Sequence, residues 1–253
     1  EQFVAEHGGR SAEHPADAVA GSQLVITSLP ADRELQAVAD GIVDVLAPGA
    51  VWIDHSTTSA EAARRVGVTV AEHGAHFLDA PVSGGVDGAR NGTLTVMCGG
   101  DPEDYAKAEP LIAHFSRMRK LLGPAGSGQL AKMVNQIAIA GLVQGLAEAV
   151  NFGMKSGLPM EDVIEVISKG AAGSWQMENR HKTMIAGKFD FGFAADWMRK
   201  DLGICLEESR RNGAPLPVTA LVDQFYAEVQ KLGGGRWDTS SLIARFQNLD
   251  RKT

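Results

Sequence analysis

Hydrophobic and polar positions alternate differently in the two halves of this 253-residue chain. Before residue 123, short apolar runs typical of buried strands alternate with stretches in which apolar residues recur at helical spacing. Strands that alternate with helices of this length predict an α/β layer with a largely parallel sheet. The predicted strands are 23–29 (expected to be buried), 50–54, 75–80, 93–98 and 118–122, and the predicted helices are 15–20, 32–46, 59–72, a short segment after Gly85, and 102–114.

After Gly123 and Pro124 the pattern predicts only helices, at 159–168, 174–186, 194–211, 217–232 and 240–246, besides the long helix that begins near residue 126. The chain is therefore expected to consist of an α/β domain, residues 1–125, followed by an all-helical domain, residues 126–253. Small-molecule sites favour the carboxyl ends of parallel strands and clefts between domains. Candidate binding residues are therefore expected at strand ends and in the helix that connects the domains.

The longest predicted helix, residues 126–157, contains no proline and stops before Pro159. Apolar residues cover nearly all of its circumference, which predicts a helix buried nearly all round. Lys132, Asn135 and Gln136 are spaced i, i+3 and i+4 and therefore share one face. Because burying an unpaired ammonium is costly, this cluster either points into a polar cleft or binds a ligand, unless it is simply a solvated helix start.

The same helix opens with the residues Gly-Ser-Gly-Gln-Leu-Ala, which match the glycine-rich fingerprint of dinucleotide-binding proteins. That fingerprint needs a further strand after its helix, and none is predicted here. The glycines are interpreted instead as allowing the helix to begin close against other backbone.

Glycines also follow the strand at 75–80. The segment Asp79-Ala-Pro-Val leads into Ser83, Gly84 and Gly85. Successive backbone N–H groups in such a turn, together with the serine hydroxyl, can bind a carboxylate or a phosphate. An ordinary strand-to-helix turn is the alternative interpretation.

Polar residues also follow the strand at 50–54. Thr58 and Glu61 fit a capping box for the next helix, whereas Ser56 and Thr57 remain available to a ligand.

Leu29 and Pro30, after the first predicted strand, either line the same ligand or simply end that strand. Lys200 precedes an aspartate in an otherwise apolar helix. It either reaches a ligand or forms a surface charge pair.

Composition narrows the range of partners. The net charge of −7, with both signs interspersed, argues against nucleic acid or an acidic membrane surface as a partner. Cys98 and Cys205 lie in apolar runs and are interpreted as reduced thiols of a cytoplasmic protein. No apolar run is expected to span a membrane, because Gln144 and Glu148 interrupt the longest helix. The scattered histidines form no metal-ligand pattern, so no metal is expected.

Three segments together resemble the β-hydroxyacid dehydrogenases, the group that contains 3-hydroxyisobutyrate dehydrogenase and tartronate semialdehyde reductase. The segments are DAPVSGGVDGARNGTLTVMCGGD, GSGQLAKMVNQ and WMRKDLGICLEES, and they follow one another in the order found in that family. The resemblance covers essentially the whole chain. It implies an α/β Rossmann-type domain that binds NAD or NADP, followed by an all-α domain that shapes the substrate site and makes the contacts of a homodimer or homotetramer.

The resemblance also implies roles for individual residues. Lys132 would be the catalytic general acid/base. The substrate would be held by Ser83, Gly84, Gly85, Asn135 and Gln136, and the cofactor would be lined by Leu29, Pro30, Thr57 and Lys200. The family usually carries two adjacent asparagines after the lysine, and Gln136 replaces the second with a side chain one methylene longer.

The family begins with a strand, a glycine-rich phosphate loop, a helix and a second strand, which is roughly 30 residues. Residues 1–9 look instead like the end of a helix already under way. The Rossmann-type domain is therefore expected to be incomplete at its N-terminus, the sequence being a fragment or lacking its first residues.

The predicted function is reversible hydride transfer between NAD or NADP and a small 3-hydroxy acid similar to 3-hydroxyisobutyrate. Lys132 exchanges the hydroxyl proton, and the turn at 83–85 anchors the carboxylate. Two alternatives remain. An imine reductase would share the fold but generally lacks this lysine, and a non-catalytic dinucleotide-binding module would have no use for a charge on a buried helix.

Overall fold

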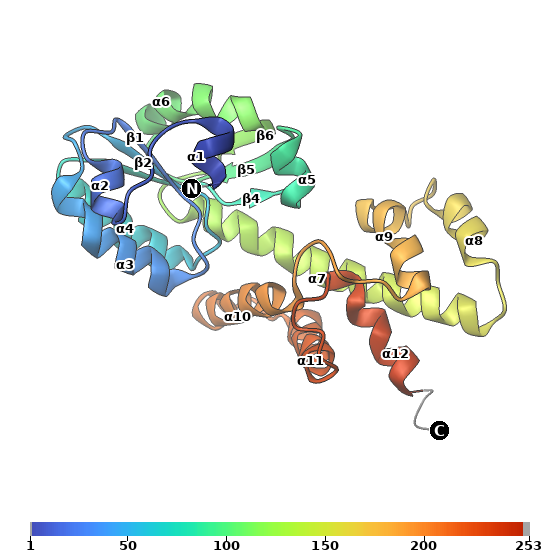
Figure 1. Ribbon diagram of the computed structural model, residues 1–253. Helices are drawn as coiled ribbons and strands as arrows, with labels where there is room; N and C mark the ends of the chain where they lie inside the picture. Colours follow the sequence, from blue (N-terminus) through green and yellow to red (C-terminus); the bar gives the residue numbers. More distant parts are fainter. Residues whose placement is uncertain (1, 250–253) are drawn as a thin grey trace. The chain divides into compact units, whose positions relative to one another are not determined.

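The computed structural model describes residues 2–249 (Figure 1). The chain divides between Lys132 and Met133 into two compact units, an α/β unit and a helical unit. Helix α7, Ser127–Lys155, begins in the first unit and continues in the second.

The α/β unit contains the predicted alternation of strands and helices. Its helices are α1 (Gln2–His7), α2 (Pro15–Val19), α3 (Asp32–Ile42), α4 (Ala60–Glu72), α5 (Gly85–Arg90) and α6 (Pro102–Ile112), with short 3-10 turns at Val43–Val45 and Ala113–Phe115. Its strands are β1 (Leu24–Thr27), β2 (Val51–Asp54), β3 (His76–Asp79), β4 (Val82–Ser83), β5 (Leu94–Cys98) and β6 (Ser116–Leu121).

The strands form two three-stranded sheets. β1, β2 and β3 lie in that order. They are parallel, as predicted. In the second sheet β5 is parallel to β6, whereas β4 pairs antiparallel with β5. Sequence patterning did not predict β4, because two residues between Pro81 and a glycine pair show no periodicity. An isolated bridge between Asp79 and Gly99 connects the two sheets.

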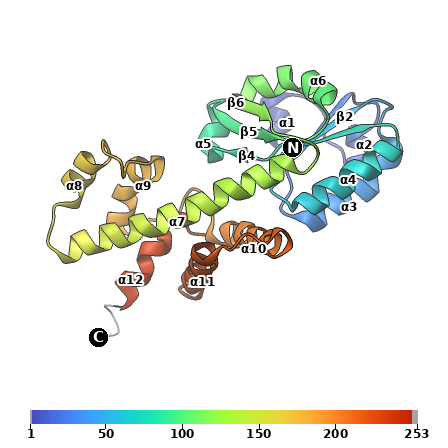
Figure 2. The ribbon, with the colours of Figure 1, turned by 180° about the vertical axis from the view of Figure 1, so that it is seen from behind.

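Helices cover both faces of the parallel sheet, because successive residues of a strand point to opposite sides. Trp52 and Phe77 pack with α3 and α4 in one core cluster. Ile53 and Leu78 pack with α6 in another. Figures 1 and 2 show α6 on the opposite side of the strands from α3 and α4.

The expectation that the first strand is buried is wrong for most of β1. Only Val25 is buried, whereas Leu24 and Ile26 are exposed. β1 is the outer strand of its sheet, and Val25 lies in the register row of Trp52, against α3 and α4. Ile26 points to the other side and is not part of the core cluster that α6 makes with Ile53.

The helical unit contains most of α7 and the helices predicted after it: α8 (Met160–Ile167), α9 (Trp175–Ala186), α10 (Ala195–Asn212), α11 (Pro217–Lys231), a 3-10 turn at Thr239–Ile243 and α12 (Ala244–Leu249). One core cluster connects them, built around large buried residues such as Met198, Leu202 and Tyr226. The predicted start of α9 is confirmed, since the Ser174 hydroxyl accepts a hydrogen bond from Met177 N. Buried Tyr226 donates its hydroxyl to Thr239 O at 3.0 Å.

Helix α7 forms as predicted, but two expectations about it are wrong. It is not buried all round, because Val134 and Phe152 are 67% and 72% exposed. It has 29 residues and contains an 18-residue window with a mean hydropathy of 1.4, so it is also long and apolar enough to cross a membrane, by length and composition only. Gln144 and Glu148 therefore do not reduce its hydropathy below that of a possible span. Core helices pass the same test, and α7 contributes Val143, among other residues, to the core of the helical unit.

Candidate active site

The carboxyl ends of β1, β2 and β3 meet at one edge of the parallel sheet. Thr27, Asp54 and Asp79 occupy one register row there, and each is the last residue of its strand. Asp54 Oδ1 accepts hydrogen bonds from Thr27 Oγ1 at 2.7 Å and from Ser56 Oγ at 2.5 Å. Ser56 Oγ in turn accepts from Leu29 N at 2.8 Å. The loops that follow β1 and β2 are thus held together by a buried carboxylate.

The predicted cofactor-lining residues Leu29, Pro30 and Thr57 lie in these two loops. Leu29 and Thr57 are half-buried and Pro30 is exposed, so the loops remain accessible from this edge of the sheet. The Oδ2 atom of Asp54 is buried and has no hydrogen-bond partner among the described residues. Burial raises the pKa of this carboxyl group, although Ser56 and Thr27 act in the opposite direction. In open α/β sheets, dinucleotides bind at the carboxyl ends of the parallel strands, close to the main chain of the loops that follow them.

Asp79 connects the end of β3 with the start of α7. Its carboxylate accepts hydrogen bonds from Gly126 N at 2.7 Å and from Gln129 N at 2.9 Å. These are N–H groups at a helix start that have no partner within the helix. Burial raises the Asp79 pKa to about 6, while the two N–H donors oppose the rise.

The glycines at this helix start allow backbone to approach closely, as expected from the sequence. A Cβ atom added to Gly128 would lie 2.6 Å from Asp79 O, and one added to Gly126 would lie 3.0 Å from Ala60 O. Neither main-chain oxygen can move without distorting the sheet or α4. The Gly-Ser-Gly segment therefore serves helix–sheet contact.

Lys132 lies one turn into α7 and is buried, 7% exposed. Its Nζ atom donates a hydrogen bond to Val82 O at 2.9 Å. Val82 and Ser83 form β4, and Gly84 and Gly85 follow with φ angles of 129° and 62°. The fold thus brings the predicted catalytic lysine to the residue that precedes the predicted carboxylate-binding turn, although 50 positions separate them in sequence.

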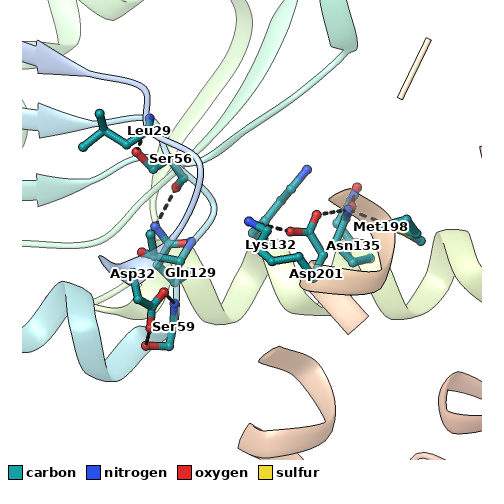
Figure 3. Close-up of polar contacts among 12 residues, drawn as sticks. Leu29, Asp32, Ser56, Ser59, Gln129, Lys132, Asn135, Met198 and Asp201 are labelled. Atoms are coloured by element: carbon teal, nitrogen blue, oxygen red, sulfur yellow. Dashed lines mark hydrogen bonds and ion pairs between the residues drawn. The ribbon is translucent and has the colours of Figure 1, made fainter. Parts of the chain in front are cut away.

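The remaining predicted residues belong to the helical unit and form a network there. Gln136 Oε1 accepts from Asn135 Nδ2 at 2.8 Å, and Gln136 Nε2 donates to Asp201 Oδ2 at 2.6 Å. Lys200 Nζ lies 2.9 Å from Asp201 Oδ1. Figure 3 shows Asn135 beside Asp201 and Met198, whose sulfur lies 3.6 Å from Gln136 Nε2. The structure thus gives Gln136 and Lys200 a shared carboxylate partner.

Four further buried residues were not among the predicted site residues: Asp54, Asp79, Gln129 and Asp201. A carboxylate directly after an apolar strand is the signal that could have identified Asp54 and Asp79. Nothing in the local sequence distinguishes Gln129 or Asp201 from surface residues of a helix.

The predicted capping box of Thr58 and Glu61 is wrong. Ser59 is the N-cap of α4, and its hydroxyl accepts from Ala62 N at 3.0 Å. Ser59 N and its hydroxyl both donate to the carboxylate of Asp32, at 2.8 and 2.5 Å (Figure 3). Thr58 N is instead bonded to Gln129 Oε1.

No group of three His, Cys, Asp or Glu side chains suited to a metal ion occurs within residues 2–249. The site so far defined is an edge of a parallel sheet with two loops, a turn of small residues and a buried lysine. These features fit the class of nicotinamide-dependent oxidoreductases.

Comparison with known proteins extends this assignment. A family model described as the NAD-binding domain of 6-phosphogluconate dehydrogenase matches residues 1–123. A second, described as NAD-binding of NADP-dependent 3-hydroxyisobutyrate dehydrogenase, matches residues 126–246. An uncharacterized oxidoreductase of Shewanella frigidimarina is 56% identical over 97% of this chain and 86% of its own length. The 2-(hydroxymethyl)glutarate dehydrogenase of Eubacterium barkeri is 34% identical over 97% of this chain and 83% of its own.

Among solved structures, 3-hydroxyisobutyrate dehydrogenase of Mycobacterium tuberculosis with L-serine superposes with a TM-score of 0.88. It is 30% identical, and the match covers 97% of this chain and 86% of that one. The chain belongs to the β-hydroxyacid dehydrogenase family. The predicted fold class, a Rossmann-type α/β domain followed by an all-α domain, is confirmed, and the cofactor is NAD or NADP. The chain is thus a nicotinamide-dependent oxidoreductase of hydroxy acids.

Proposed function

We propose that the chain catalyses reversible oxidation of a small 3-hydroxy acid to the corresponding aldehyde acid, with Lys132 as general acid/base. The observation that carries this proposal is the hydrogen bond from Lys132 Nζ to Val82 O, directly before Ser83, Gly84 and Gly85. It brings a buried ammonium to the turn that would bind a carboxylate. In this proposal residues 1–125 bind the cofactor, and residues 126–253 complete the substrate site.

The turn at 83–85 suits a substrate carboxylate because two of its residues have no side chain. Gly84 has a φ of 129°, and a Cβ atom there would lie 3.2 Å from Leu94 Cδ2. Gly85 has a φ of 62°, and a Cβ atom there would meet nothing within 4 Å, so its surroundings are open. The N–H groups of this segment and the Ser83 hydroxyl can donate to an anion.

The relatives suggest which hydroxy acid fits. 3-Hydroxyisobutyrate, 2-(hydroxymethyl)glutarate and L-serine, the compounds named with those relatives, all contain HOCH2–CH(R)–COO⁻. Only R differs among them. A site that binds the carboxylate at 83–85 and places the hydroxyl at Lys132 would recognise the shared part.

In the oxidation direction, the neutral amine of Lys132 accepts the proton of the substrate hydroxyl as the C–H hydrogen leaves as hydride. A bound nicotinamide ring supplies the hydride acceptor. In the reverse direction the ammonium of Lys132 donates a proton to the aldehyde oxygen. Leu29, Pro30 and Thr57 would line the cofactor. Asn135, Gln136 and Lys200 would complete the substrate and nicotinamide environment.

We also infer a cytoplasmic homodimer or homotetramer. Neither cysteine forms a disulfide within residues 2–249, and both are buried, which suits a reducing compartment. Exposed apolar side chains on α7, such as Val134 and Phe152, could be covered by a second subunit. Sedimentation of the purified protein tests the assembly, and a monomer at micromolar concentration would contradict it.

The test of the activity is a panel of 3-hydroxy acids and cyclic imines, assayed with NAD and NADP on the full-length gene product. Turnover of HOCH2–CH(R)–COO⁻ compounds, and none of their esters, is expected. Reduction of a cyclic imine with no oxidation of hydroxy acids would support an imine reductase instead.

A further inference from the structure

The side chain of Gln129 is fully buried in the first turn of α7, and within residues 2–249 it bonds only to main chain. Its Nε2 atom donates to Ser56 O at 2.9 Å, and its Oε1 atom accepts from Thr58 N at 3.1 Å. The residue between these two main-chain groups is Thr57, which is proposed to line the cofactor. The amide of Gln129 therefore fixes the backbone on both sides of Thr57.

Gln129 is connected to the other strand ends as well. Its own N–H donates to Asp79 Oδ2 at 2.9 Å, at the end of β3. Ser56, whose carbonyl it binds, also accepts from Leu29 N through its hydroxyl. Hydrogen bonds thus run without interruption from the loop after β1 to the start of α7 (Figure 3).

We propose that Gln129 is a positioning residue for the cofactor, which fixes the loop around Thr57 at a set place relative to the α7 turn that carries Lys132. This inference rests on the proposed function of Thr57 and Lys132. Lys132 follows Gln129 by three positions, so less than one helical turn separates the residue that binds the loop from the general acid/base.

The chemistry of the two bonds explains why a glutamine is needed. The loop presents one acceptor, Ser56 O, and one donor, Thr58 N, so the side chain must donate and accept at once. A primary amide does this at every pH. A carboxyl group does it only while protonated, and an apolar side chain never does. Asparagine carries the same amide, but on a side chain one methylene shorter than that of glutamine.

The experiment uses this difference between an amide and a carboxyl group. In Gln129→Glu, the protonated carboxyl can donate its O–H to Ser56 O and accept from Thr58 N. The ionised form would instead direct a second acceptor at Ser56 O. Burial and the nearby carboxylates of Asp79 and Asp54 raise the pKa of the introduced group. Arg64 lies near this helix start, where its Nε donates a hydrogen bond to Ala125 O. Its positive charge lowers the pKa of the introduced carboxyl group.

NAD(P)H affinity is measured by fluorescence titration against pH in wild type, Gln129→Glu and Gln129→Met. Gln129→Glu is expected to bind within about threefold of wild type at low pH and about tenfold or more weakly at high pH. Gln129→Met is expected to bind weakly at every pH. The control is Gln144→Met, at a buried glutamine of the same helix that bonds to Glu148. It is expected to leave cofactor affinity unchanged.

A residue that only fills space would change the melting temperature without changing cofactor affinity or its pH dependence. The proposal is overturned if Gln129→Glu and Gln129→Met bind NAD(P)H as wild type does at all pH values. Should Gln129→Met not fold, Gln129→Glu at low pH retains both bonds and supplies the comparison. Failure of the proposed function is distinguishable, because a wild type that binds NAD(P)H but oxidises no 3-hydroxy acid leaves these affinity differences intact.

Discussion

Three buried polar side chains of the α/β unit and two of the helical unit are held in different ways. In the α/β unit, Lys132, Gln129 and Asp79 all bond to main-chain atoms. In the helical unit, Gln136 and Asp201 bond to each other's side chains. One group is fixed by the backbone of the sheet and its loops, and the other by neighbouring side chains that are themselves rotatable.

This difference suggests a division of work. Main-chain atoms of strands, and of the loops and helix starts joined to them, are restrained by the backbone on either side, so a group bound to them keeps its direction. Groups that must stay fixed during hydride and proton transfer are best held in that manner. A side-chain network can rearrange when one member changes, which suits the part of a substrate that differs among relatives. Four substitutions test this comparison.

The largest effect is expected for Lys132→Ala. Removal of a general acid/base costs about 10² to 10⁴ in kcat. Fold and cofactor affinity should be retained, and the pH dependence that the lysine imposes on kcat should disappear. The matched control is Lys155→Ala, at the exposed end of the same helix. A Lys132→Ala enzyme within a few-fold of wild type across the pH range would remove Lys132 from the mechanism.

Asp79 tests whether burial raises the pKa of a carboxyl group that is held by main-chain donors. Its pKa is about 6 in the folded chain against an ordinary 3.8, so the folded state binds the proton more tightly. The contribution of this group to stability is therefore full below about pH 4 and falls by roughly 3 kcal/mol as pH rises through 6.

Urea unfolding of wild type and Asp79→Asn between pH 4.5 and 7.5 measures this contribution. Asparagine does not titrate in this range, so the stability of wild type relative to the variant should decline as pH rises. Parallel curves for the two proteins would show that the Asp79 pKa is not raised in the folded state.

Gly84→Val tests the proposed carboxylate turn. A valine at a φ of 129° is strained, and its Cβ would press on Leu94. We expect KM for the hydroxy acid to rise about tenfold or more, with cofactor affinity nearly unchanged. Gly49→Val is the control. Gly49 also has a positive φ, 76°, and open surroundings, but it precedes β2 and so lies at the end of that strand away from the candidate site. Equal effects of both variants on KM would show that strain alone is responsible.

The smallest effect is expected for Gln136→Asn in the helical unit. Asparagine restores the residue usual in the family but is too short to keep the 2.6 Å bond to Asp201 unchanged. Because the network can rearrange, kcat/KM should change by about fivefold or less. Gln144→Asn, at a buried glutamine outside the network, should have no effect on kcat/KM. A loss as large as that of Lys132→Ala would contradict the division of work between the two units.

The sequence by itself determined the order and type of the main elements. Alternating short apolar runs and helical periodicity are local properties, which is why β2, β3, β5 and most helices agree with prediction. The family resemblance likewise depends on contiguous motifs around Ser83, Lys132 and Lys200. β4 and the cap of α4 were missed because two-residue strands and competing hydroxyls at Thr58 and Ser59 give no distinct local pattern.

Only the tertiary structure decided which polar residues meet. Lys132 contacts Val82 across 50 positions, and Gln129 contacts Ser56 across 73. It also decided that Asp79 serves the start of α7 and that Ile26 in β1 and Phe152 in α7 are exposed. The physical reason is that burial and hydrogen-bond partners depend on which distant segments pack together. A side chain's own sequence neighbourhood specifies its backbone conformation and not the atoms opposite it.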